Sequence, residues 1–106
     1  MENKVRGSLL LAVYGPVLTR RQQEIMTLYL DDDLSLAEIA QMHGVSRQGV
    51  HDTIRRAQHV LDELEEKLGF AAKYLRFQAL AQEQRKMIGE DASAVLDKML
   101  ALWEDE

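Results

Sequence analysis

The chain has 106 residues, no cysteine and a formal net charge of −5 at pH 7. This length fits one domain, alone or with an added oligomerisation segment, and the lack of cysteine excludes disulfides and cysteine-based zinc sites. The acidic balance argues against indiscriminate nucleic-acid binding. No apolar run approaches the roughly 20 residues of a membrane span, so we expect a cytoplasmic protein without membrane insertion.

The first thirty residues are predicted to form two helices. The first runs from Glu2 or Asn3 to Tyr14 and stops at Gly15-Pro16, since proline cannot donate a backbone hydrogen bond. Thr19 caps the second helix, and Gln22 three residues later completes a capping box. The acidic run 31–33 lacks the ligand spacing of a calcium loop and reads as a solvated loop. The inward residues of the second helix are expected to be Ile25, Met26 or Leu28, Tyr29 and Leu30.

Residues 35–57, SLAEIAQMHGVSRQGVHDTIRRA, are predicted to form a helix-turn-helix. Gly44 can take the left-handed conformation that ends the first helix, Val45 fills the angle between the helices, and Ser46 is a good N-cap for the second. Apolar residues at helical spacing point inward on each helix: Leu36, Ile39 and Ala40 on the first, and Val50, Ile54 and Ala57 on the second.

The polar residues of the second helix are predicted to share its outer face, because successive positions differ by about 100°. They are Arg47, Gln48, His51, Asp52 and Arg55, side chains of the kinds that read base edges or hold phosphates. We expect Arg47 and His51 to be exposed while Val50 and Ile54 are buried. A small basic face in an acidic chain favours selective nucleic-acid binding. The alternative is a solvated helix face without a ligand.

Gly49 lies in the first turn of this second helix, where glycine costs about 0.5–1 kcal/mol relative to alanine. Two explanations are open. The backbone approaches a phosphate or base closely, or glycine is simply tolerated on an exposed turn.

No catalytic group of residues is evident in the sequence. His43, His51 and His59 are spaced by eight residues, whereas two histidines sharing a metal on a helix are typically four apart. His43 beside the turn reads as a structural or solvated residue. We therefore expect no enzyme activity, no metal and no cofactor.

The second helix of the motif is predicted to continue well beyond the length needed to read DNA. Its apolar residues alternate spacings of four and three, like a heptad seam, and Gly69 ends it. The seam comprises Val50, Ile54, Ala57, Leu61, Leu64 and Leu68. A fifth helix then runs from about Ala71 to Ile88 and ends at Gly89, and Asp91 or Ser93 caps a last one. The last helix carries Val95, Leu96, Met99, Leu102 and Trp103.

The predicted architecture is all-α, with a first helix and helix-turn-helix unit at 1–68 and, in the same domain, additional packing or dimerisation helices at 69–106. Large apolar side chains beyond the helix-turn-helix suggest burial against a second copy. The expected dimer interface comprises Leu64, Leu68, Phe70, Tyr74, Phe77 and Trp103. The alternative is a compact monomer that buries Trp103 against its own first helix.

Residues 18–68 resemble region 4 of bacterial sigma factors through LTRRQQEIMTLYL, SLAEIA and GVSRQGVHDTI. The resemblance implies a helix-turn-helix without a wing, in which Arg47, Gln48, His51 and Asp52 face the bases. It implies backbone contacts from Arg20, Arg21, Ser35 and Arg55. Ser46 and Arg56 complete the expected nucleic-acid-binding set, with Arg56 on a phosphate. The other sigma regions are absent from the chain.

A second resemblance is to the YlxM family of small bacterial proteins, through LYLDDDLSLAEIA followed by VSRQGVHDTIRRAQHVLDELEEKLG. Members are typically encoded beside the signal recognition particle GTPase and its receptor, so the resemblance implies a regulatory role in that pathway. The implied ligand is DNA or the particle's RNA, although the A-form major groove is too narrow for a helix. The alternative is a protein-interaction module that contacts the GTPase or its receptor.

Overall fold

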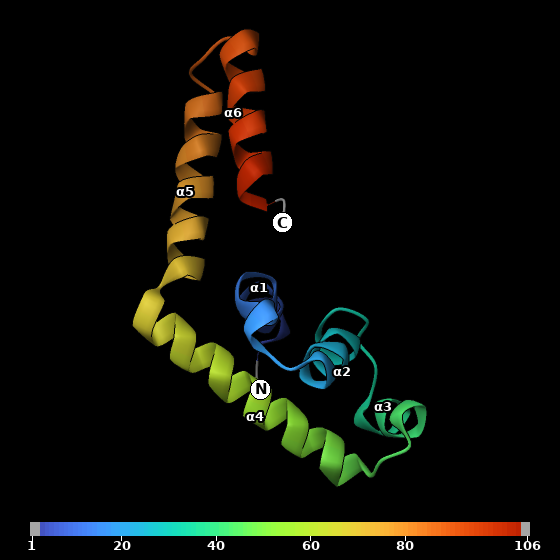
Figure 1. Ribbon diagram of the computed structural model, residues 1–106. Coiled ribbons are helices and arrows are strands. Elements are labelled where there is room, and N and C mark those ends of the chain that lie inside the picture. The colour runs from blue at the N-terminus through green and yellow to red at the C-terminus, as the bar shows by residue number, and fades with distance from the viewer. Residues whose placement is uncertain (1–2, 105–106) are drawn as a thin grey trace. The chain divides into compact units, whose positions relative to one another are not determined.

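The computed structural model describes residues 3–104, and of Trp103 and Glu104 it describes only the helical backbone. Within this range it contains six α-helices and no strand, which confirms the all-α helix-turn-helix prediction (Figure 1). The elements are α1 (Lys4–Tyr14), the 3₁₀ turn η1 (Gly15–Val17), α2 (Arg20–Leu30), α3 (Leu36–His43), α4 (Arg47–Leu68), α5 (Phe70–Arg85) and α6 (Glu90–Glu104). None of the described helices is both long and apolar enough to cross a membrane.

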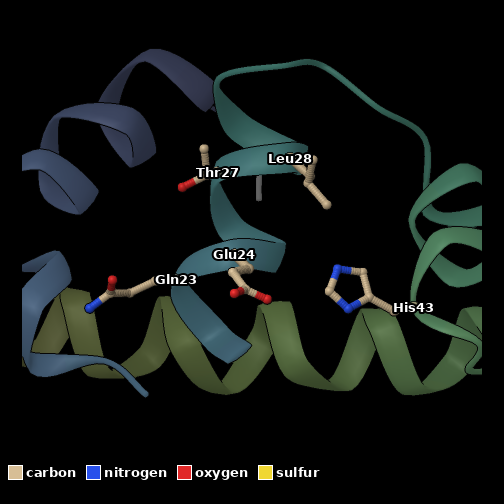
Figure 2. Close-up of a pocket in the computed structure, with 5 residues that line it drawn as sticks. All are labelled: Gln23, Glu24, Thr27, Leu28 and His43. Atoms are coloured by element: carbon tan, nitrogen blue, oxygen red, sulfur yellow. The ribbon is translucent and has the colours of Figure 1, made fainter. Parts of the chain in front are cut away.

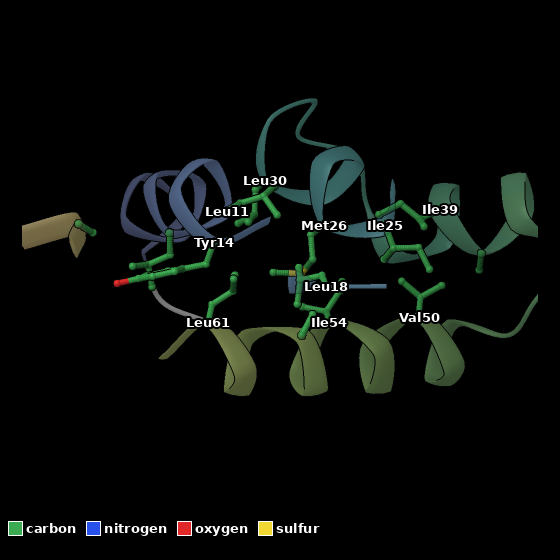
Figure 3. Packing of buried hydrophobic residues seen from close by; sticks show 14 residues of the cluster. Leu11, Tyr14, Leu18, Ile25, Met26, Leu30, Ile39, Val50, Ile54 and Leu61 are labelled. Atoms are coloured by element: carbon green, nitrogen blue, oxygen red, sulfur yellow. The ribbon is translucent and has the colours of Figure 1, made fainter. Parts of the chain in front are cut away.

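The chain forms two compact units, an N-terminal unit Met1–Ala71 and a C-terminal unit Ala72–Glu106. In the N-terminal unit, α4 packs against α1, α2 and α3 and supplies one side of the core (Figure 3). The predicted seam of α4 is buried through Leu61, half-buried at Leu64 and exposed at Leu68. The buried cluster comprises Leu10, Leu11, Tyr14, Leu18, Ile25, Met26, Leu30, Ile39, Ala40, Val50, Ile54, Ala57, Leu61 and Ala71.

Two helices of the N-terminal unit begin with a capping box, of which the one at Thr19 was predicted and the one at Ser35 was not. The hydroxyl of Thr19 accepts from the N–H of Gln22 at 3.1 Å, while the Gln22 side chain accepts from the N–H of Thr19. Ser35 and Glu38 make the same reciprocal pair at the start of α3. The N–H and hydroxyl of Ser35 hold the pKa of the Glu38 carboxyl below its ordinary value. These caps fix where α2 and α3 begin.

Two details of the first helices differ from the expectation. Asn3 is the N-cap of α1 rather than a helical residue, because its side chain accepts from the N–H of Arg6; Glu2 lies outside the described residues. On α2, Ile25, Met26 and Leu30 are buried as predicted, but Tyr29 is only half-buried, as is Leu28, the alternative to Met26. The Nζ atom of Lys4 lies 4.2 Å from the centroid of the Tyr29 ring, so α1 partly covers this edge of α2.

The acidic loop 31–33 is exposed, as predicted, and is tied to α1. Lys4 Nζ lies 2.7 Å from Asp33, and the Ser8 hydroxyl donates to Asp31 at 2.5 Å. On α1, Arg6 also forms an ion pair with α4, in which its Nη1 atom lies 2.9 Å from Oδ1 of Asp62. The pairing raises the pKa of Lys4 and lowers that of Asp33. The loop therefore binds α1 through the side chains of Asp31 and Asp33.

The junction between α4 and α5 is held by Tyr14 and Glu65. The Tyr14 hydroxyl donates to the Glu65 carboxylate at 2.6 Å and accepts from the N–H of Phe70 at 3.1 Å. Glu65 also accepts from the N–H of Ala71 at 3.0 Å, and the Tyr14 ring stacks on Phe70 at 6.4 Å between centroids. Together these contacts satisfy two N–H groups that the first turn of α5 leaves without helical partners.

We expect the stability of the fold to decline above about pH 10 partly through Tyr14. Burial, followed by the bond to Glu65, raises the pKa of Tyr14, so the folded chain favours its protonated form. That contribution is complete below the pKa of an unfolded tyrosine and is lost as the pH rises through the folded value. Urea midpoints measured at pH 9 and pH 11 should therefore fall more for the parent than for Tyr14→Phe. Equal falls in the two proteins would contradict this role.

The end of α5 and the start of α6 were predicted wrongly. Helix α5 spans Phe70–Arg85 rather than 71–88, because a turn closed by the N–H of Met87 and the carbonyl of Gln84 ends it before Gly89. Helix α6 begins at Glu90, so Asp91 and Ser93 lie inside it rather than at its cap. Its first helical hydrogen bond runs from the N–H of Ser93 to the carbonyl of Gly89.

The C-terminal unit is a hairpin of α5 and α6 (Figure 1). Ala81 and Leu100 are buried in it, and Arg85 forms an ion pair with Asp97 across the two helices. Tyr74 and Phe77 are half-buried, whereas Leu75 and Leu80 are exposed. The predicted packing of Trp103 concerns a side chain outside the described part of the structure.

Candidate nucleic-acid interface

The turn between α3 and α4 is closed by backbone and side-chain hydrogen bonds on both sides. Gly44 has φ +64°, the left-handed conformation predicted for it, and Val45 is half-buried against the core. The N–H of Val45 donates to the carbonyl of Ala40 at 3.0 Å. The Ser46 hydroxyl accepts from the N–H of Gly49 at 2.9 Å and caps α4. The predicted boundary at 44–46 is confirmed, and it fixes the direction in which α4 leaves the turn.

The two faces of α4 differ as the helical spacing predicts. Val50, Ile54, Ala57 and Leu61 are buried against the other helices of the unit. The reading face, defined here as Arg47, Gln48, His51, Asp52 and Arg55, lies on the solvent side. All its members are exposed except Asp52, which is half-buried, and Arg56 beside it is exposed as well. A ligand can therefore reach these side chains without disturbing the core.

Asp52 is the electrostatic centre of the reading face. Its Oδ1 accepts from the side-chain amide of Gln48 at 3.2 Å and lies 3.7 Å from Arg55 Nη2 and 3.9 Å from His51 Nδ1. Among the residues that the structure describes, Arg47 and Arg56 form no ion pair. Asp52 thus orients Gln48 and partly neutralises Arg55, while Arg47 and Arg56 keep their full charge for an anionic ligand.

Gly49 has a contact that the sequence did not suggest. A Cβ at this position would lie 3.2 Å from the Ser46 hydroxyl oxygen, tighter than ordinary van der Waals contact. The hydroxyl of Thr53 also donates to the Gly49 carbonyl at 3.0 Å. Room for the helix cap is therefore a structural reason for glycine, beside the two explanations left open above.

The three remaining candidate residues lie at other helix starts. Arg20 and Arg21 are exposed in the first turn of α2, where Arg20 Nε lies 3.4 Å from Glu24. Ser35 is the N-cap of α3, and its hydroxyl accepts from the N–H of Glu38. Their contact with a nucleic-acid backbone stays a prediction.

A groove of about 400 Å³ borders the reading face and was not foreseen from the sequence. It contains His51 and Arg55 of the reading face together with residues of α2 and α3. Its lining comprises Tyr29, Leu36, His51, Ile54, Arg55, Gln58, His59 and Asp62. No local sequence signal could reveal it, because it exists only where three separate helices meet.

A second hollow of about 400 Å³ lies between α2 and the end of α3 (Figure 2). His43, expected to be structural or solvated, is half-buried and borders this hollow with Glu24 and Leu28. Within the described residues, no group of three histidines or carboxylates lies close enough together to hold a metal ion.

Comparison with known proteins places these features in a family. A family model described as "Putative helix-turn-helix protein, YlxM / p13 like" matches residues 1–99. The UPF0122 protein of Symbiobacterium thermophilum is 45% identical over 103 residues, which cover 96% of each chain. A UPF0122 protein of Acetivibrio thermocellus is 48% identical over 88 residues, covering 83% of this chain and 75% of the relative. A UPF0122 protein of Clostridium kluyveri is 37% identical over 106 residues, covering 100% of this chain and 86% of the relative. The chain therefore belongs to the YlxM/p13-like helix-turn-helix family.

Proposed function

We propose that the chain is a non-enzymatic regulator that binds nucleic acid with the reading face of α4, in the manner of sigma factor region 4. The observation that carries the proposal is the exposed, mostly cationic and amide face of a capped helix whose opposite face is fixed in the core. A helix held in this way can enter the major groove of DNA without a folding cost at binding.

In the proposed complex, the N-terminal turns of α4 enter the groove. Arg47, Gln48 and His51 meet base edges, while Arg55 and Arg56 neutralise phosphates. Arg20, Arg21 and Ser35 would hold the backbone on either side. Because the chain carries a net charge of −5 and few free cations face the ligand, its binding should be selective rather than general.

The proposed ligand is DNA, with the signal recognition particle RNA as the second nucleic acid to test, and the site of action is the cytoplasm. The role in the signal recognition particle pathway is supported by the family resemblance alone. We further propose that the chain acts as a homodimer, because a two-fold dimer presents two α4 helices to a pair of half-sites.

A second candidate function is that of a protein-interaction module. Asp52 at the centre of the reading face and the acidic chain as a whole favour a partner with a basic surface. In this proposal, that partner is the particle's GTPase or its receptor, and α4 contacts protein instead of a groove. The helix-turn-helix fold is compatible with either role.

The test is an anisotropy titration of the parent chain onto labelled duplex DNA and onto the particle RNA at two salt concentrations. The proposal predicts affinity that falls steeply with salt and is lost in the Arg47→Ala/Arg55→Ala double variant. Each lost phosphate contact should reduce the salt slope by about 0.9. The matched control is Lys67→Ala/Lys86→Ala, which removes the same charge away from the reading face. Weak, salt-independent binding, or equal losses in both double variants, would contradict the proposal.

Asp52→Asn should tighten binding to duplex DNA of mixed sequence by roughly threefold to fivefold, the range of a single exposed charge interaction. The variant removes a negative charge facing phosphates and releases Arg55, while the asparagine oxygen can still accept from Gln48. Glu66→Gln, at an exposed position near the end of α4, is the control and should change affinity little. A clear loss of affinity in Asp52→Asn would instead mean that Asp52 itself bonds a base.

A further inference from the structure

Gln48 is a member of the reading face whose side-chain amide is held by a neighbour. It is the second residue of α4, and the N-terminal residues of a recognition helix are those that contact base edges. Its Nε2 atom donates to Oδ1 of Asp52, one helical turn further along, at 3.2 Å. Within residues 3–104, this is the only hydrogen bond between two side chains of the reading face. The bond limits what Gln48 can offer to a base.

The chemistry of the two side chains fixes the orientation of this amide. A carboxylate can only accept hydrogen bonds, whereas an amide has two N–H donors on its nitrogen and an acceptor oxygen. The Gln48 amide therefore turns its nitrogen toward Asp52, and one of its two N–H groups is occupied there. One N–H and the carbonyl oxygen remain for a ligand. Gln48 is exposed, so a base can approach both groups.

Asp52 is recessed in the reading face. Its side chain is 37% exposed, compared with 56% for His51 and 69% for Arg55. Its Oδ1 atom is also shared, because it accepts from Gln48 and lies 3.7 Å from Arg55 Nη2 and 3.9 Å from His51 Nδ1. A recessed oxygen with three neighbours is better placed to orient Gln48 than to accept a hydrogen bond from a base.

The bases differ in what they present to this restricted amide in the major groove. Adenine presents the N7 acceptor and the N6 amino donor side by side, which match the free N–H and the oxygen of Gln48. Guanine presents two acceptors, N7 and O6. A free glutamine could meet both with its two N–H groups, but Gln48 has only one left, and its oxygen would face an acceptor. Cytosine and thymine each present a single polar group, so only adenine can form two hydrogen bonds with Gln48.

We propose that Gln48 selects adenine in the bound DNA duplex, and that Asp52 is the positioning residue that excludes guanine. This inference rests on the duplex binding proposed above, and it names the base that one residue of the reading face recognises. It also explains why a carboxylate, which repels phosphates, lies in a face that binds nucleic acid. Asp52 lowers the overall affinity and in return makes Gln48 selective.

The experiment begins with selection of duplexes from a random library by the full parent chain and by Gln48→Ala. The base pair whose preference is lost in Gln48→Ala is the pair that Gln48 reads, and the parent should place adenine there. Anisotropy titrations then compare a selected duplex with the same duplex carrying guanine at that position. The parent should bind the adenine duplex at least about fivefold more tightly, the lower end of the discrimination expected from one bidentate contact.

Asp52→Asn tests the positioning role. Asparagine can donate to the Gln48 oxygen as well as accept from its nitrogen, which frees both N–H groups of Gln48 for guanine. The preference for adenine over guanine should therefore fall by roughly threefold or more, since guanine gains a second hydrogen bond. Glu66→Gln removes an equal charge at an exposed position of α4 and should keep the parent's preference. A general change in charge or stability alters both affinities and leaves their ratio unchanged.

Three results would overturn this inference while leaving binding by the reading face intact. They are a base other than adenine at the pair that Gln48 reads, a full set of preferences retained in Gln48→Ala, and an Asp52→Asn preference equal to that of the parent. A parent chain that binds no duplex would overturn the proposed function as well, so the two failures are distinguishable.

Discussion

Leu61→Ala is expected to lower the free energy of unfolding by about 2–5 kcal/mol, the cost of removing a large buried side chain that leaves a cavity. Leu61 is fully buried in the core, on the side of α4 that packs against α1 (Figure 3). It lies beyond the part of α4 that would read DNA. A large loss would therefore show that the extension of α4 is part of the fold of the N-terminal unit.

The measurement is urea denaturation followed by circular dichroism, with Leu68→Ala as the control. Leu68 ends α4 and is 43% exposed, so the same truncation there should cost less than about 1 kcal/mol. Similar losses at the two positions would mean that α4 does not hold α1 through a packed core.

Arg47→Ala is expected to weaken binding at a specific DNA site by about 1–3 kcal/mol if the guanidinium bonds a guanine. Stability should hardly change, because Arg47 is exposed and forms no ion pair within the described residues. The measurement is an anisotropy titration onto a duplex selected by the parent from a random library, together with urea denaturation of both proteins. Lys67→Ala, at the far end of the same helix, removes an equal charge and should bind nearly as the parent does.

One outcome would reassign the reading face to a protein partner. An Arg47→Ala variant that binds DNA and RNA like the parent, yet loses affinity for the signal recognition particle GTPase, would support the protein-interaction function over the nucleic-acid function.

The helix-turn-helix could be predicted because its signals are local. Gly44, Ser46 and Thr19 act on backbone groups within a few residues, and the burial of Val50 and Ile54 follows from helical periodicity. The same periodicity placed Arg47 and His51 on the exposed side. Local chemistry was misleading near the C-terminal helices, where several residues offered the same signal. Gly89, Asp91 and Ser93 all suggested helix ends, while the backbone turn at Met87 decided the boundary.

The remaining features depend on residues far apart in the chain. Tyr14 and Glu65 are joined across 51 positions, and Arg6 and Asp62 across 56, so no sequence window contains either pair. The groove beside the reading face likewise requires α2, α3 and α4 to be in place. Asp52 could be assigned to the outer face from spacing, but its shared contacts with Gln48 and Arg55 depend on side-chain conformations.

The central claim, that α4 contacts the nucleic acid through its reading face, is tested most directly by residue-resolved NMR. A ¹⁵N-labelled chain is titrated at low salt with a short duplex of mixed sequence, and amide shift changes are mapped on the structure. We predict that the largest changes cluster at residues 46–56, with smaller ones at the starts of α2 and α3. Saturable binding that shifts residues 72–104 while leaving 46–56 unchanged would contradict the claim.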